Sequence, residues 1–170
     1  MIAYVILVSI ALVMAGIIYA WLTTFVPKTP QECPDGSSIS VKDIEYDCSL
    51  NILNLSLKNN GRFSLGGYFI HASNVSGQEL AILDLTQYFS DSEPPGEGLT
   101  VNPGIKFHSY GQNTLPPNNY VTHIFNLSSS PSGTLYSLEI TPFRYETDGS
   151  KTKLVSCTNA RITNYKIVCE

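Results

Sequence analysis

Four cysteines are the residues whose chemistry can be argued most directly from this sequence of 170 residues. They are Cys33, Cys48, Cys157 and Cys169. An even number of cysteines in a chain with a membrane signal is typical of disulfide bonds formed outside the cytoplasm. Of the three possible connectivities we expect Cys33–Cys48 and Cys157–Cys169, because each bond then closes a short loop, worth about 3 kcal/mol on the chain-entropy estimate.

Two other interpretations of the cysteines are buried free thiols and a zinc site. Zinc sites in proteins commonly contain closely spaced cysteine or histidine ligands. The sequence has no C-x-x-C spacing, and its three histidines, His71, His108 and His123, are scattered along the chain. The sequence therefore predicts no metal centre at these residues, and each histidine is expected to be an ordinary surface or core residue.

Neither the acidic residues nor the local motifs predict catalysis. Asp84, Asp91, Glu93 and Glu97 surround a Pro- and Gly-rich segment and have the oxygens that a hard cation prefers, but a solvated acidic loop is the simpler interpretation. The chain has no G-x-S-x-G, H-E-x-x-H, P-loop or Rossmann pattern. We therefore expect a protein that is not an enzyme and that has no catalytic residues and no cofactor.

The charge of the chain argues against nucleic acid as a partner. The formal net charge is -4, only 14% of residues are charged, and Lys and Arg form no cluster. Nucleic-acid-binding domains usually present a basic patch. Surface polarity here comes from Asn, Ser and Thr, which is typical of an extracellular surface or of a contact between subunits.

The N-terminal segment has the length and composition of a membrane-spanning helix. No charged residue precedes Lys28, and Ile2–Val26 would form a helix about 37 Å long. Pro27 then ends it, so we expect one continuous helix through residues 2–25. Tyr19 and Trp21 lie near its outer end, where interfacial aromatic residues are common.

A secretory signal peptide is the alternative interpretation of this segment. Such peptides have a basic start and a shorter apolar region, and both features are missing here. The absence of a basic flank indicates either a mature chain whose leader was removed or an orientation determined by something else.

Small residues recur four positions apart in the hydrophobic segment. The pairs are Ala11 with Ala15 and Gly16 with Ala20. Small residues at this spacing allow the backbones of two helices to approach closely. They favour helix packing, although Ala and Gly are frequent in any membrane helix.

Beyond a polar linker at 28–37, the chain has the pattern of β-strands. Leu53, Leu55 and Leu57 alternate with polar residues, which indicates a strand with one buried face. Asn60-Gly61 and Asp148-Gly149 are typical hairpin turns. Strands are expected at 63–74, 79–89, 119–127, 135–145, 151–157 and 161–168, with a loop at 90–104.

These elements predict an α+β chain. We expect a long N-terminal hydrophobic helix at 1–27, the linker at 28–37, and an antiparallel immunoglobulin-like β-sandwich of about seven or eight strands at 38–170.

Three Asn-x-Ser sequons lie in the strand-rich region. Asn54 and Asn126 alternate with apolar neighbours, and Asn74 lies at the end of a strand. All three are expected to point outward, where N-glycosylation is possible in an exported domain. Chance occurrence in a chain rich in Asn and Ser is the alternative.

The stretch ILVSIALVMAGIIYAWLTTFV, and its centre ALVMAGIIYAW in particular, resembles the archaeal type IV pilin and archaellin superfamily. Segments such as LNLSLKNNGRFSLGGYFI and LYSLEITPFRY resemble pilin-like proteins of small-genome archaea. The bacterial branch typically has Phe at the first mature position and Glu at the fifth, where this chain has Met1 and Val5.

The resemblance implies a structural subunit of a cell-surface filament. A leader peptidase would remove a basic leader, the subunit would wait in the membrane, and assembly machinery would transfer it into a helical homopolymer. The hydrophobic helices would then form the core of the filament, with the β domains outside. The alternative is a single-pass, membrane-anchored binding module that does not polymerise.

Overall fold

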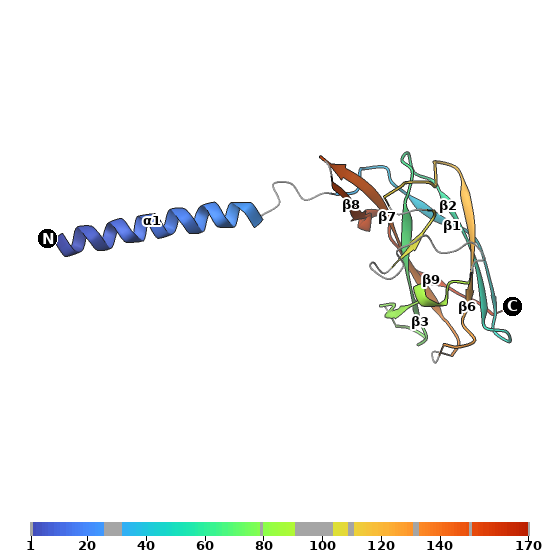
Figure 1. The fold of residues 1–170 in the computed structure, drawn as a ribbon. Coiled ribbons are helices and arrows are strands. Elements are labelled where there is room, and N and C mark those ends of the chain that lie inside the picture. The colour runs from blue at the N-terminus through green and yellow to red at the C-terminus, as the bar shows by residue number, and fades with distance from the viewer. Residues whose placement is uncertain are drawn as a thin grey trace. The chain divides into compact units, whose positions relative to one another are not determined.

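The computed structural model describes residues 2–25, 32–78, 80–90, 104–108, 111–130, 133–149 and 151–169. By its internal contacts the chain divides into two units, Met1–Gln31 and Glu32–Glu170. The first contains the helix α1, and the second, which we call the head, contains the strands of the described residues. Figure 1 shows both units as ribbons.

α1 is a continuous helix of 24 residues, Ile2–Phe25. Its interior backbone groups are bonded within the helix, so the apolar side chains determine which surroundings it tolerates. It ends shortly before Pro27, whose nitrogen has no proton to donate and whose ring disfavours a helical conformation in the preceding residue. The prediction of one helix through residues 2–25 is confirmed.

The first layer of the head is a three-stranded antiparallel sheet in the order β1-β2-β6. Its strands are β1 (Ile39–Asp47), β2 (Ile52–Asn59) and β6 (Tyr120–Asn126). The leucines of β2 are at most 1% exposed and alternate with half-buried polar residues. The alternation in the sequence therefore identifies the buried face of β2 correctly.

The second layer is a six-stranded antiparallel sheet with the path β4-β3-β7-β8, in which β5 also pairs with β3 and β9 with β7. Its strands are β3 (Gly67–Ser73), β4 (Leu83–Asp84), β5 (Ile105–Lys106), β7 (Ser137–Asp148), β8 (Lys151–Ser156) and β9 (Ile162–Lys166). The hairpin predicted at Asp148-Gly149 is confirmed. It joins β7 to β8, and Gly149 has a φ of 62°, which favours glycine.

Both sheets contribute to one hydrophobic core. The three-stranded sheet supplies Tyr46, Leu53, Leu55, Leu57 and Phe125, and the six-stranded sheet supplies Tyr68, Ile70, Ala72, Leu138 and Ile140. The chain thus combines an apolar helix with antiparallel sheets packed around a common core, which is the α+β class expected from the sequence.

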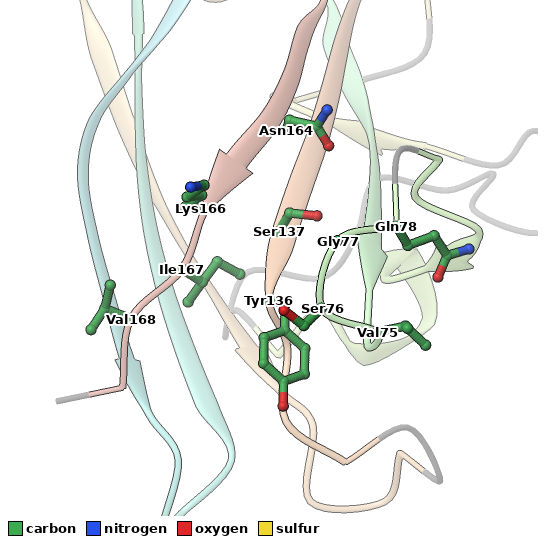
Figure 2. A pocket seen from close by; sticks show the side chains of 10 residues that line it. All are labelled: Val75, Ser76, Gly77, Gln78, Tyr136, Ser137, Asn164, Lys166, Ile167 and Val168. Atoms are coloured by element: carbon green, nitrogen blue, oxygen red, sulfur yellow. The ribbon is translucent and has the colours of Figure 1, made fainter.

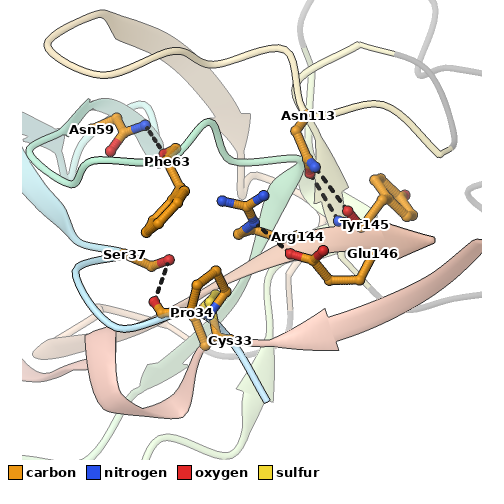
Figure 3. Close-up of polar contacts among 10 residues, drawn as sticks. Cys33, Pro34, Ser37, Asn59, Phe63, Asn113, Arg144, Tyr145 and Glu146 are labelled. Atoms are coloured by element: carbon orange, nitrogen blue, oxygen red, sulfur yellow. Dashed lines mark hydrogen bonds and ion pairs between the residues drawn. A yellow bond between two sulfur atoms is a disulfide. The ribbon is translucent and has the colours of Figure 1, made fainter. Parts of the chain in front are cut away.

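The hairpin predicted at Asn60-Gly61 is wrong. β2 pairs with β1 and β6, whereas β3, the next strand along the chain, belongs to the six-stranded sheet. Asn59 is the physical reason, because its fully buried side chain donates to the carbonyls of Phe63 and Leu115, each at 2.9 Å. Its Oδ1 also accepts the N–H of Gly61, so the chain is directed across to the other sheet. Figure 3 shows the bond between Asn59 and Phe63.

The segment between β3 and β6 departs further from the prediction. The return strand expected at 63–74 is observed only from Gly67 to Ser73. The strand expected at 79–89 is reduced to the two residues of β4 and the short 3-10 helix η1 (Thr86–Tyr88). Most of the loop expected at 90–104, including Asp91, Glu93 and Glu97, lies outside the described residues.

The predicted disulfide pairing is also wrong. The bonds are Cys33–Cys157, with 4.9 Å between the Cα atoms, and Cys48–Cys169, with 5.5 Å. β1 lies between Cys33 and Cys48, and its nine residues in extended conformation separate its ends by about 30 Å. That is far more than the Cα separation of about 7 Å that a disulfide can bridge. η2 (Thr158–Ala160) and β9 likewise lie between the other two cysteines.

Candidate interaction surfaces

α1 presents an apolar surface on all sides. Its large side chains are exposed, from 42% for Val8 to 79% for Ile2. The hydroxyls of Ser9 and Thr23 donate to the carbonyls of Val5 and Ala20, at 2.8 and 2.9 Å. Because these polar side chains are bonded within the helix, they can enter an apolar environment without losing a partner.

The small residues of α1 form two separate faces. At 100° per residue, Ala11 and Ala15 lie about 140° around the helix axis from Gly16 and Ala20. A Cβ atom added at Gly16 would meet no other atom within 4 Å. One helix therefore has two places where a neighbouring helix could approach closely.

By length and composition, α1 can cross a membrane over Ile2–Thr23. A signal sequence near an N-terminus has the same properties. The helix therefore indicates either membrane insertion or a signal sequence, and the two disulfides of the head indicate an extracellular location.

The three sequons occupy different settings. Asn54 lies in the middle of β2, is half-buried, and its Nδ2 donates to Oε2 of Glu45 at 3.4 Å. Asn74 is exposed directly after β3, and Asn126 is exposed at the last position of β6. Oδ1 of Asn126 accepts the N–H of Ser128 at 3.1 Å as well as its hydroxyl, so this sequon has a compact turn conformation.

We predict that glycans occur at Asn74 or Asn126 before Asn54. An enzyme must surround the acceptor amide, and exposed residues at strand ends are more accessible than the centre of a paired strand. Peptide mapping of natively purified chain checks this, and the variant that combines Asn74→Gln with Asn126→Gln is expected to lose the glycan mass. A measured mass equal to that of the bare polypeptide would show that the chain is not glycosylated. A glycan at Asn54 alone would contradict the predicted preference for Asn74 or Asn126.

The outward face of the three-stranded sheet contains a shallow polar hollow of about 240 Å³. It is lined by Asp43, Glu45, Asn54, Ser56, Thr122 and Ile124. Oγ of Ser56 and Oγ1 of Thr122 are 2.7 Å apart. Nearby, Nζ of Lys42 lies 3.4 Å from the centre of the Tyr120 ring. This face is polar and hydrogen-bonding, as the composition of the chain predicts.

A second hollow, which we call the C-terminal groove, has a volume of about 410 Å³. The turn at 75–78, the start of β7 and the segment from Asn164 to Val168 form its walls (Figure 2). Val75, Tyr136 and Val168 are 56%, 44% and 77% exposed. The groove combines apolar and polar side chains at a size that suits a small ligand.

The three histidines lie in different settings. His71 is on β3, His108 is exposed, and His123 is buried on β6 with Nδ1 2.7 Å from the hydroxyl of Tyr68. Within the described part of the chain, no group of three or more His, Cys, Asp or Glu residues could hold a metal ion. His123 is thus a core histidine with a polar partner in the other sheet.

Arg144 has a structural environment that the sequence does not reveal. Its Nε lies 3.0 Å from Oε1 of Glu146, and its guanidinium carbon lies 5.0 Å from the centre of the Phe63 ring. Nη1 is buried without a hydrogen-bond partner among the described residues. Figure 3 shows the contact between Arg144 and Glu146.

No known family model, curated protein or solved structure matches this chain.

Proposed function

We propose that this chain is a structural subunit, a pilin, of an archaeal type IV pilus-like filament on the cell surface. The observation that supports this most is α1, an uncharged helix of 24 residues with two small-residue faces about 140° apart. Such a helix suits packing against at least two neighbours. We propose further that the head belongs to the immunoglobulin-like sandwiches, displayed on the outside of the filament.

The energetics of α1 favour assembly from the membrane rather than from water. Apolar surface transferred out of water contributes about 25 cal/mol per Å², so the free helix is unstable in water. Exchanging lipid for neighbouring helices gains much less, because lipid is also apolar. Assembly would therefore need outside work, from machinery that acts after a leader peptidase has released the subunit.

The second candidate is a single-pass anchored binding module. The C-terminal groove favours it, because a volume of about 410 Å³ with Tyr136, Asn164 and Lys166 at its walls could hold a ligand. In this reading α1 serves only as an anchor and the head acts alone. The two candidates differ in whether α1 contacts other copies of the chain.

Bulky substitutions on the small-residue faces separate these candidates. We expect Gly16→Leu with Ala20→Leu to reduce the amount of filament at least about tenfold, because each 1.4 kcal/mol of lost packing is a factor of ten. Membrane insertion should persist, since leucine is more apolar than the residues it replaces. Quantifying filaments and membrane-bound chain in the same cells measures both effects.

A matched control is Ile10→Leu with Met14→Leu, which conserves side-chain volume at positions at least about 80° around the helix axis from the centre of either small-residue face. Control filaments should form at the normal level. Normal filaments from the Gly16 and Ala20 variant would contradict the packing role of these residues. If the unsubstituted chain forms no filaments at all, the proposed filament function is contradicted and the anchored binding module is favoured.

A further inference from the structure

The two disulfides cross each other along the chain. Cys33, just before β1, is bonded to Cys157, just after β8, and Cys48, just after β1, is bonded to Cys169, after β9. Cys169 also forms a parallel bridge with Tyr46 of β1. Each bond therefore connects the beginning of the head with its end.

This connectivity shortens the covalent path through the head. A chain of n residues spans at most about 3.3–3.6 Å for each residue. From Cys33 the path crosses to Cys157 and reaches Cys169 after only about 12 more residues, an extended length of about 40 Å. Without the bonds, the path from Cys33 to Cys169 contains about 136 residues, or about 470 Å.

We infer that the crossed disulfides limit the extension of the head to about 40 Å under a force that enters through the linker and leaves through the C-terminal segment. Residues 49–156, which contain seven of the nine strands found among the described residues, lie outside the short path. These seven strands then carry none of the applied force. This inference does not rest on the filament proposal, because an anchored module under tension would behave in the same way.

Either disulfide alone is sufficient for this protection. If only Cys48–Cys169 remains, the path follows about 15 residues from Cys33 to Cys48 and crosses to Cys169, an extended length of about 50 Å. If only Cys33–Cys157 remains, the path keeps its length of about 40 Å. The two bonds are thus redundant in carrying load.

Pulling the full chain in detergent micelles from its two ends tests the inference in a single-molecule force experiment. The completely extended chain should gain about 430 Å of contour length when a reductant is added. α1 contributes equally to both states, so the difference reports the head alone. Variants Cys33→Ala/Cys157→Ala and Cys48→Ala/Cys169→Ala should each stay within about 20 Å of the oxidised parent.

Two results would overturn the inference. An oxidised chain whose head reaches an extended length of about 380 Å would show that Cys33 pairs with Cys48 and Cys157 with Cys169. The middle of the head, residues 48–157, would then carry the load. Full extension of either two-alanine variant without reductant would show that one bond does not suffice. Because the parent chain is compared with and without reductant, poor folding of a variant does not spoil the main test.

Discussion

Replacing all four cysteines by alanine is expected to lower the free energy of unfolding of the head by about 8 kcal/mol. The first bond to close spans 124 residues and contributes about 5 kcal/mol on the chain-entropy estimate. The second contributes about 3.5 kcal/mol, because the first has already shortened the path between its cysteines. Since domains are typically stable by about 5–15 kcal/mol, this loss is a large fraction of the stability of the head.

Denaturant unfolding of the detergent-solubilised chain, followed by a signal from the head, measures this effect. The matched controls are the two variants that lack one bond, each expected to remain folded and to lose about 3.5 kcal/mol. A four-alanine variant within about 2 kcal/mol of the parent would contradict the role of the crossed bonds, because the loss should be several times larger.

The second large effect is expected at Asn59. Asn59→Leu keeps a similar volume but leaves the carbonyls of Phe63 and Leu115 and the N–H of Gly61 without their side-chain partner. The carbonyl of Leu115 also accepts the N–H of Leu65 at 2.9 Å, and the N–H of Gly61 also donates to the carbonyl of Ser38 at 3.2 Å, so these two groups keep a backbone partner. The carbonyl of Phe63 loses its partner, and a buried polar group without a partner costs about 1–3 kcal/mol, so we expect a loss of about 2 kcal/mol. The same denaturant measurement reports it.

Asn60→Ala is the matched control for Asn59→Leu. Asn60 is exposed, and its Nδ2 donates to Oγ of Ser40 at 2.7 Å. Substitution of an exposed residue of this kind should change stability by less than about 1 kcal/mol. Equal stability of the two variants would show that the bonds of Asn59 do not direct the crossing between the sheets.

Local patterns in the sequence predict those elements whose structure depends on local forces. α1 follows from an uncharged run that ends before a proline, and the β7–β8 hairpin follows from Asp148-Gly149. Asn60-Gly61 has the same kind of local signature but does not form a hairpin. There the side chain of Asn59 bonds to Leu115, which lies 56 residues away, and no local pattern contains that partner.

The disulfides and the C-terminal groove were missed for a related reason. Loop length favoured short-range bonds, whereas the extended conformation of β1 holds Cys33 and Cys48 apart. Recognition of β1 as a full strand could have excluded that pairing, since its length is incompatible with the bond. The groove joins three segments that are distant in the sequence, so the sequence alone could not have revealed it.

Electron microscopy of filaments sheared from the cells that make this chain tests the proposed function most directly. We expect filaments built from this subunit, with a core of packed α1 helices and the heads on the outside. Each α1 should contact at least two neighbours, with Gly16 and Ala20 at a close helix–helix contact. Recovery of the chain only as single molecules in the membrane, with no filament that contains it, would contradict the proposed function as a filament subunit.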